Sequence, residues 1–176
     1  MNYVLRPWNI NDLETLVIYA NNANIAKNMT DGFPHPYTPE HGKSFIEFAT
    51  KNNPVHIFAI DVNGEAVGGI GIHPQTDIYR KNAELGYWLA ELFWGNGIIT
   101  KAIIEMIDYG FKTFEIDRIF ARPFGTNLVS QKVLEKAGFQ REAVFENILI
   151  KNGEYENEII YGIRRSDYVL LKEENG

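Results

Sequence analysis

The sequence predicts one domain of mixed α/β class, and two observations support this. First, segments with the period of a strand alternate with segments with the period of a helix along a chain of 176 residues. Second, the hydrophobic fraction of 45% and the charged fraction of 23% are typical of a globular protein, and such a chain buries about 70% of its unfolded surface. We therefore expect a single domain over residues 1–171 and a frayed polar tail over residues 172–176.

The N-terminal half has two predicted helices among three predicted strands. The first helix begins at Asn11 or Asp12, either of which can cap its free N–H groups. Thr38 caps the second helix, ahead of a proline at the first helical position. The buried stripe of this second helix consists of Phe45, Phe48 and Ala49. The strands cover residues 3–5, 55–62 and 66–73, and a hairpin turn at Asn63-Gly64 joins the last two.

The C-terminal half has four predicted strands and two predicted helices. Its first strand turns Glu84, Gly86 and Trp88 to one face, because side chains alternate along a strand. Its first helix has apolar residues at helical spacing, and Gly138 ends its second helix in a left-handed conformation. The strands cover residues 83–90, 118–123, 144–150 and 155–163, the helices cover 99–114 and 126–137, and a turn over 151–154 joins the last two strands.

Missing residue types exclude two kinds of chemistry. The chain has no Cys, so it forms no disulfide, no thiolate-ligated metal site and no thiol nucleophile. Its four His stand at positions 35, 41, 56 and 73, without the i, i+4 spacing of helical zinc sites. We expect no metal ion.

The charge and hydropathy patterns exclude further classes. The formal net charge is −6 and the isoelectric point is about 5.2, which disfavours a nonspecific nucleic-acid binder. No stretch approaches the roughly 20 apolar residues of a membrane span. The N-terminal residues lack the layout of a signal peptide. We expect a cytoplasmic protein that binds neither nucleic acid nor membrane.

The sharpest local pattern is a glycine-rich turn between a strand and the long helix, Trp94-Gly95-Asn96-Gly97-Ile98-Ile99-Thr100. Glycines let the backbone approach a ligand closely, and the free N–H groups of a first helical turn attract an anion such as phosphate. A dinucleotide fingerprint would need a third glycine at Thr100, and a P-loop would need a Gly-Lys-Ser/Thr sequence. The alternative is a tight turn without a ligand.

A second pattern lies at the start of the later helix, where Asn127 precedes Ser130. By themselves, these two residues are a helix cap and a first-turn hydroxyl. The helix that they begin ends in Glu135-Lys136-Ala137-Gly138-Phe139. The order of this pattern after the glycine-rich turn gives Asn127 and Ser130 a second interpretation.

The order of strand, glycine-rich turn, helix, strand and Asn-x-x-Ser helix ending in Lys-x-Gly-Phe resembles the GNAT superfamily of acyl-CoA-dependent N-acetyltransferases. The segments 83–89 and 93–97 are similar to its Rim-type branch, which includes ribosomal-protein N-terminal alanine acetyltransferases. The resemblance is strongest from residue 83 to residue 139. It implies a central, mostly antiparallel sheet of about seven strands, with helices on both faces and a cleft between two parallel strands.

The resemblance implies acetyl-CoA as the cosubstrate. Its pyrophosphate would lie on the glycine-rich turn, on the backbone of Gly95, Asn96, Gly97, Ile98, Ile99 and Thr100. Its pantetheine arm would pair with the preceding strand, at Trp88, Leu89 and Ala90, as an added strand would. Asn127 would contact the same arm.

The family's pyrophosphate signature is Gln/Arg-x-x-Gly-x-Gly/Ala, and this chain follows it only in part. Gly97 matches the signature. Trp94 replaces its first polar residue and Ile99 its small last residue. Lys101 stands where this branch commonly has Glu.

The resemblance further implies direct attack of an amine on the thioester, without a covalent enzyme intermediate. Glu84 is the candidate general base, acting directly or through water. The alternative is that Glu84 only pairs with a neighbouring cation such as Arg122. Ser130 or a water would protonate the departing thiolate, because Leu134 stands where the family often has a tyrosine.

The acceptor is expected to be a small amine or a protein N-terminus, and the negative net charge favours a cationic one. Aromatic residues on a loop supply its candidate wall: Phe33, His35 and Tyr37. Exposed strands near the C-terminal hairpin could support a homodimer. An alternative from another class is a catalytically idle acyl-CoA-binding sensor, which Ile99, Lys101 and the missing tyrosine favour.

Overall fold

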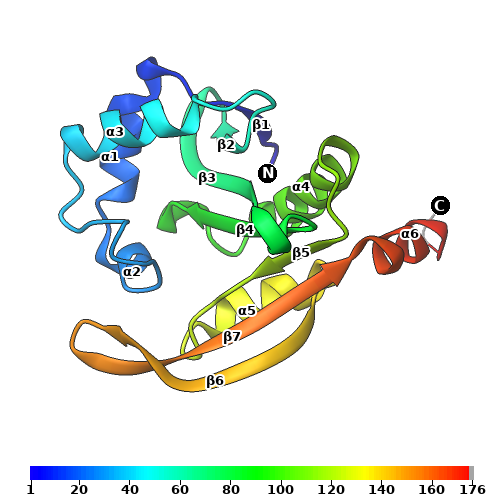
Figure 1. The fold of residues 1–176 in the computed structure, drawn as a ribbon. Helices are drawn as coiled ribbons and strands as arrows, with labels where there is room; N and C mark the ends of the chain where they lie inside the picture. The colour runs from blue at the N-terminus through cyan, green and yellow to red at the C-terminus, as the bar shows by residue number, and fades with distance from the viewer. Residues whose placement is uncertain (175–176) are drawn as a thin grey trace. The chain divides into compact units, whose positions relative to one another are not determined.

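The structure is a computed structural model that describes residues 1–174 (Figure 1). Within these residues lie seven strands: β1 (Val4–Pro7), β2 (Ile57–Val62), β3 (Glu65–Pro74), β4 (Asn82–Leu89), β5 (Arg118–Ala121), β6 (Gln140–Lys151) and β7 (Glu154–Arg164). The α-helices are α1 (Leu13–Ala20), α2 (Ala23–Ala26), α3 (Pro39–Ala49), α4 (Ile98–Thr113), α5 (Leu128–Lys136) and α6 (Arg165–Glu174). Short 3-10 helices are η1 (Ile10–Asp12), η2 (Asp77–Tyr79) and η3 (Glu91–Phe93).

The sheet has the strand order β1-β2-β3-β4-β5-β7-β6. β4 and β5 pair in parallel, whereas β1 with β2, β2 with β3, β5 with β7 and β6 with β7 pair antiparallel. The predicted mixed α/β class, with a mostly antiparallel sheet and one parallel pair, is confirmed. The four-residue α2 and the C-terminal α6 were not among the predicted elements.

The chain divides into two compact units. Unit 1 contains residues 1–71 and 87–102, and unit 2 contains residues 72–86 and the chain from residue 103 onward. β3, β4 and α4 each run from one unit into the other. A single domain over residues 1–171 stays a prediction. The expected tail over 172–176 is helical as far as Glu174, and residues 175–176 lie outside the described residues.

Unit 1 has an aromatic and aliphatic core beneath α1 and α3. It consists of Trp8, Leu16, Ala20, Ile25, Tyr37, Ile46, Ala49, Ile57, Ala59, Ala66 and Trp88. The side chain of Thr38 caps α3 as predicted, accepting a hydrogen bond from the His41 amide. The predicted stripe of α3 is wrong at Phe48, whose side chain is 53% exposed. Two residues after buried Ile46, Phe48 lies about 200° around the helix and points away from the core.

The start of α1 is built differently from the prediction. The side chain of Asn9 accepts a hydrogen bond from the Asn11 amide at 2.6 Å, and caps η1 rather than α1. Asp12 stands at the N-cap position of α1, but its carboxylate makes no bond to that helix. It accepts two hydrogen bonds from Arg6, at 2.7 and 2.8 Å. These bonds raise the pKa of Arg6 above its usual value.

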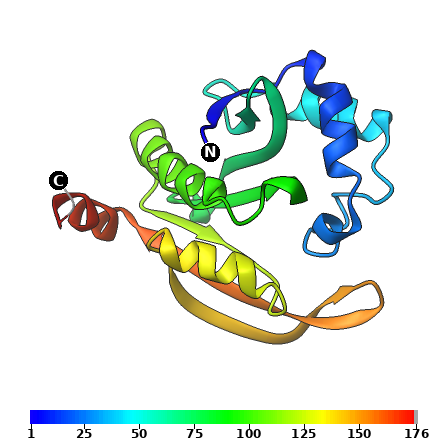
Figure 2. The ribbon, with the colours of Figure 1, turned by 180° about the vertical axis from the view of Figure 1, so that it is seen from behind.

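Unit 2 packs α4 and α5 on its strands. Its buried residues include Ile72, Ile103, Met106, Ile107, Ile119, Leu134, Tyr161 and Ile163. A Cβ atom at Gly110 of α4 would lie 2.5 Å from Ile72 Cδ1, so a larger residue there would require the Ile72 side chain to move. α5 lies along the long hairpin of β6 and β7 (Figure 2).

Both predicted hairpin turns have the backbone that their sequences require. Asn63 and Gly64 have φ of 56° and 90°, and Asn152 and Gly153 have φ of 53° and 83°. Two successive positive φ values characterise the tight turn that Asn-Gly favours. These turns confirm the predicted connections from β2 to β3 and from β6 to β7.

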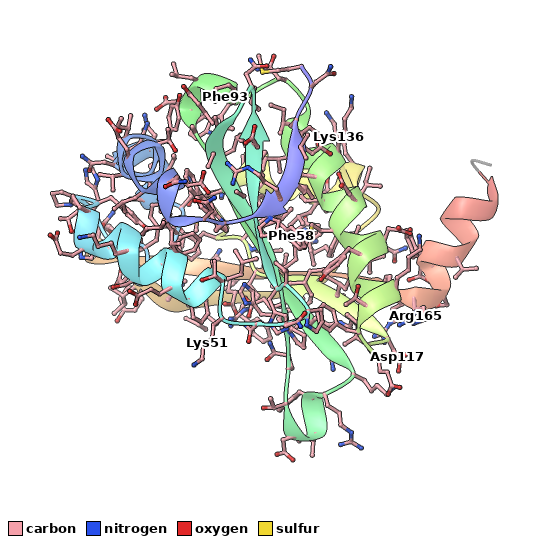
Figure 3. All side chains as sticks on the ribbon, turned by 90° about the horizontal axis from the view of Figure 1, so that it is seen from above. Lys51, Phe58, Phe93, Asp117, Lys136 and Arg165 are labelled. Atoms are coloured by element: carbon pink, nitrogen blue, oxygen red, sulfur yellow. The ribbon has the colours of Figure 1, made fainter. Side chains whose placement is uncertain are left out.

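The end of α4 is held by one arginine. Arg165, the first residue of α6, donates to the carbonyl oxygens of Phe111, Phe114 and Ile116 at distances between 2.6 and 3.2 Å. Its guanidinium also lies 5.0 Å from the ring centre of Phe111. Figure 3 shows Arg165 beside Asp117, with 3.9 Å between Arg165 Nε and Asp117 Oδ1. Carbonyls at a helix C-terminus lack donors within the helix, and the guanidinium of Arg165 supplies donors for them.

We predict that Arg165→Ala lowers the free energy of unfolding by about 1.5–3 kcal/mol, because charged hydrogen bonds to these carbonyls are lost. Urea denaturation measures the change. The control is Arg164→Ala, because the side chain of Arg164 is 62% exposed and reaches Glu142 only at 3.8 Å. This control should stay within about 0.5 kcal/mol of the unchanged protein. Equal losses in both variants would contradict the capping role of Arg165.

Candidate active site

A cluster of three charged side chains lies in unit 2: Glu84 of β4, Arg122 after β5 and Glu158 of β7. Arg122 Nε donates to Glu84 Oε1 at 2.9 Å, and Arg122 Nη2 donates to Glu84 Oε2 at 2.9 Å. Arg122 Nη1 lies 3.6 Å from Glu158 Oε1. The hydrogen bond with Glu84 raises the pKa of Arg122 above its usual value. Two carboxylates therefore share one permanent cation.

Strand alternation positions Glu84 away from the core. Its neighbours Ala83 and Leu85 are buried, so the side chain of Glu84 lies on the opposite face of β4. The parallel register pairs Glu84 with Phe120 on β5. Gly86, two residues along the same face, is exposed, and a Cβ atom there would have no other atom within 4 Å. Glu84 therefore has open space beside it along the strand.

The pairing of Glu84 with Arg122 is the alternative that the sequence left open. In this pairing both carboxylate oxygens of Glu84 accept hydrogen bonds from Arg122. The role of Glu84 as a general base stays a prediction.

The glycine-rich turn in unit 1 has an unusual backbone. Gly95 and Gly97 have φ of 77° and 73°, and neither has another atom within 4 Å of a Cβ position. The Asn96 side chain donates to the carbonyls of Phe93 and Trp94, which braces the turn. α4 begins at Ile98, so the N–H groups of its first turn have no carbonyl partner within the helix. This arrangement suits an anion held by backbone amides.

The residues at the start of α4 differ in how deeply their side chains are buried. The side chain of Ile98 is buried in the core, and those of Ile99 and Thr100 are half-buried. Any contact of these residues with a phosphate would therefore come from the backbone amides.

The backbone at the end of β4 already makes bonds of its own. The Ala90 amide donates to the Val67 carbonyl at 2.8 Å, and the Leu89 carbonyl accepts from Trp94 Nε1 at 2.7 Å. The Trp88 side chain is buried in the core of unit 1. The Ala90 N–H, one of the groups expected to bind the pantetheine arm, thus already donates its hydrogen bond to β3.

Asn127 and Ser130 adopt the helix-cap arrangement. Asn127 Oδ1 accepts a hydrogen bond from the Ser130 amide at 3.1 Å, at the start of α5. Both side chains are half-buried. The cap leaves the amide NH₂ of Asn127 as the group that could donate to a ligand.

Glu156 of β7 anchors the loop that carries Asn127, a role that sequence reasoning missed. Its carboxylate accepts hydrogen bonds from the Thr126 amide at 3.2 Å and from Thr126 Oγ1 at 2.7 Å. The Gly125 amide donates to the Asn157 carbonyl at 2.8 Å. The partners are separated by about 30 residues, so no local motif marks them.

The three aromatic residues expected to form an acceptor wall are placed differently from one another. The Tyr37 side chain is 5% exposed, and its burial raises the pKa of Tyr37 to about 12. Phe33 is half-buried and packs on Tyr37 and Trp88, with ring centres 5.2 and 5.7 Å apart. His35 is exposed. Tyr37 thus belongs to the core of unit 1, and only Phe33 and His35 present surface for contact.

Neither a metal-binding cluster nor a membrane-spanning helix is found among the described residues. No three His, Asp or Glu side chains in residues 1–174 gather as a metal ion would require. No helix in that range is both long and apolar enough to cross a membrane.

A family model described as "Acetyltransferase (GNAT) domain" matches residues 2–140 of the chain. The chain belongs to the GNAT acetyltransferase family. Unit 1, β4, α4 and α5 all fall within the matched range.

Known proteins of this family resemble the chain over different lengths. It is 34% identical over 99 residues to the uncharacterized N-acetyltransferase YoaA of Bacillus subtilis, covering 56% of this chain and 55% of YoaA. The chain thus matches only about half of this curated relative's length. The microcin self-immunity acetyltransferase MccE, solved with acetyl-CoA and AMP, is 27% identical with a TM-score of 0.79, covering 92% of each chain. The ribosomal-protein alanine acetyltransferase of Vibrio fischeri is 25% identical with a TM-score of 0.79, covering 96% of each.

Leu134 stands where the resemblance to the GNAT family leads us to expect a tyrosine. Leu134 is completely buried and forms part of the core beneath α5. The buried Tyr161 donates a hydrogen bond to Glu135 Oε1 at 2.8 Å, and its burial raises its pKa to about 12. The Tyr161 proton is thus committed to Glu135, and Ser130 or a water stays the predicted proton donor.

Proposed function

We propose that this chain is an acetyl-CoA-dependent N-acetyltransferase that acts on a primary amine by direct attack. The observation that carries the proposal is the carboxylate of Glu84, paired with Arg122 beside the open strand position at Gly86, in a chain of the GNAT family. Membership of the family favours this enzyme over the idle acyl-CoA sensor.

The glycine-rich turn fits the pyrophosphate of acetyl-CoA. At Gly95 and Gly97 the backbone is bare of side chains and the surroundings are open. The amides of Ile98, Ile99 and Thr100 supply donors at the positive end of α4. We also assign Asn127, Trp88, Leu89 and Ala90 to the cofactor, on the family resemblance. The bound cofactor supplies the activated acetyl thioester.

The chain's own residues handle the protons. Glu84 receives a proton from the acceptor amine, directly or through water, because only a neutral amine has the lone pair needed for attack. Ser130 or a water gives a proton to the sulfur that leaves. No side chain forms a covalent bond to the acetyl group.

The acceptor is a small amine or a protein N-terminus. The name of the Vibrio fischeri protein gives an alanine of a ribosomal protein as what it acetylates, which supports the second choice here. Phe33 and His35 remain the proposed wall for the acceptor. A homodimer and a cytoplasmic location are also parts of this proposal, and both rest on the sequence alone.

A panel of acceptors tests the proposal. Peptides with ribosomal-protein N-termini, polyamines and amine-bearing antibiotics are each mixed with acetyl-CoA and the protein, and free CoA thiol is measured. We expect one class to raise thiol release well above thioester hydrolysis. Binding of CoA with no amine-dependent release would instead support the sensor.

A further inference from the structure

The arginine that engages Glu84 is held loosely enough to leave. The side chain of Arg122 is 45% exposed, whereas Glu84 is 28% exposed and Glu158 only 14%. Because the guanidinium is this exposed, water and salt screen its attraction to Glu84. The contact of Arg122 with Glu84 can therefore be exchanged for another cation at small cost.

Arg122 has a second carboxylate to which it can move. Its Nη1 atom lies 3.6 Å from Glu158 Oε1, beyond the length of a good charged hydrogen bond. Glu158 lies on β7, and its backbone forms an antiparallel β-bridge with Phe124. A small rotation of the guanidinium would shorten this contact while it lengthens the contact to Glu84.

An acceptor amine meets Glu84 as an ammonium ion, because alkyl amines are largely protonated at neutral pH. It needs the same carboxylate oxygens that the guanidinium now holds. Open space at Gly86 gives it a way to reach them along β4. The cluster has two carboxylates for one guanidinium, so its net charge attracts a second cation.

We propose that Arg122 is a positioning residue that stands in for the acceptor: its guanidinium occupies Glu84 until the ammonium group of the acceptor replaces it, and then pairs with Glu158. The proposal rests on the proposed function, in which Glu84 takes the acceptor's proton. No bond is made or broken in the exchange. Arg122 thereby lowers the affinity for weakly bound amines.

The kinetic test removes the guanidinium of Arg122 and measures KM and kcat for the acceptor. In Arg122→Ala, KM for the acceptor should fall about fivefold, the ratio that corresponds to about 1 kcal/mol, while kcat stays within about twofold. Arg122→Lys keeps the charge but loses the two-pronged contact, so its KM should lie between those of the other two proteins. A fall in kcat with unchanged KM would overturn the proposal, because Arg122 would then act on Glu84 while the acceptor is bound.

The chain offers a matched control in Arg118. It is the first residue of β5, four residues before Arg122, and it also pairs with a carboxylate, but its partners are Glu142 and Asn82. Arg118→Met removes the same charge from the same segment of the chain without freeing Glu84. Its KM for the acceptor should match that of the unchanged protein. A fivefold fall in this control as well would show a general charge effect and overturn the proposal.

Binding of methylguanidinium decides the proposal without turnover. By NMR, millimolar methylguanidinium should shift the backbone amide signals of Glu84 and Glu158 in Arg122→Ala and leave them unmoved in the unchanged protein. No shift in the variant overturns the stand-in role, whatever the enzyme assays give. A shift in the variant together with no acetylation of any amine would overturn the proposed function alone.

Discussion

Glu84→Gln is expected to lower kcat about 100- to 10,000-fold at neutral pH, the range typical for loss of a general base. Glutamine keeps the size of the side chain and its hydrogen bonding, but cannot accept the proton of an ammonium group. Arg122 would keep an oxygen acceptor, so the surrounding face of the sheet should stay folded. Steady-state release of CoA thiol at saturating acceptor measures the change, and calorimetry should show unchanged acetyl-CoA affinity.

The matched control for this prediction is Glu142→Gln. Glu142 also pairs with an arginine of β5, Arg118, which lowers the pKa of the carboxyl. Within the described residues, Glu142 makes no hydrogen bond or ion pair with Glu84. Its variant should keep kcat within about threefold, as expected for a surface charge outside the reacting groups. If Glu84→Gln falls no further than this control, the base lies elsewhere.

Gly97→Ala is expected to weaken acetyl-CoA binding about 10- to 100-fold, which corresponds to the loss of one charged hydrogen bond from a backbone amide. At φ of 73° a Cβ atom strains the backbone, so the turn relaxes and its amides move away from the pyrophosphate. Calorimetric titration with acetyl-CoA measures the affinity. kcat at saturating acetyl-CoA should change far less than KM for acetyl-CoA.

Gly64→Ala separates this effect from strain alone. Gly64 lies in the same unit, has φ of 90° and likewise has no other atom within 4 Å of a Cβ position. Its variant should lose a similar stability, about 1–2 kcal/mol, because it places a side chain in the left-handed region. Its acetyl-CoA affinity should not change. Equal losses of affinity in both variants would show that the turn at Gly97 does not hold the cofactor.

Elements that depend on neighbouring residues in the chain were predictable. Asn63-Gly64 and Asn152-Gly153 dictate their turns through their own φ angles, and Thr38 caps α3 with its own hydroxyl. The apolar stripe of α4 likewise follows from helical spacing.

Elements that depend on distant contacts were not predictable. Helix α6 begins at Arg165, which is held by carbonyls about 50 residues earlier in the chain. Phe48 fits an apolar stripe by spacing but faces outward, because Ile46 and Ala49 already fill the contact with the core. Periodicity indicates that a helix has an apolar face, but packing decides which of its residues are buried.

In the candidate site, too, local patterns were predictable and distant contacts were not. The glycine-rich turn and the Asn127 cap are local patterns, and both have the predicted backbone arrangement. The links from Arg122 to Glu158 and from Thr126 to Glu156 join strands far apart in the sequence. Only the register of the sheet brings such residues together.

Direct transfer of an acetyl group from acetyl-CoA to an amine is the central claim, and a single-turnover experiment tests it most directly. Protein in excess is mixed with radiolabelled acetyl-CoA and the best acceptor of the panel, quenched at successive times and separated into protein, acceptor and small acids. We predict that the label leaves CoA and enters the acceptor at one rate, with none on the protein. Label that passes first through the protein, or ends as free acetate, would contradict the claim.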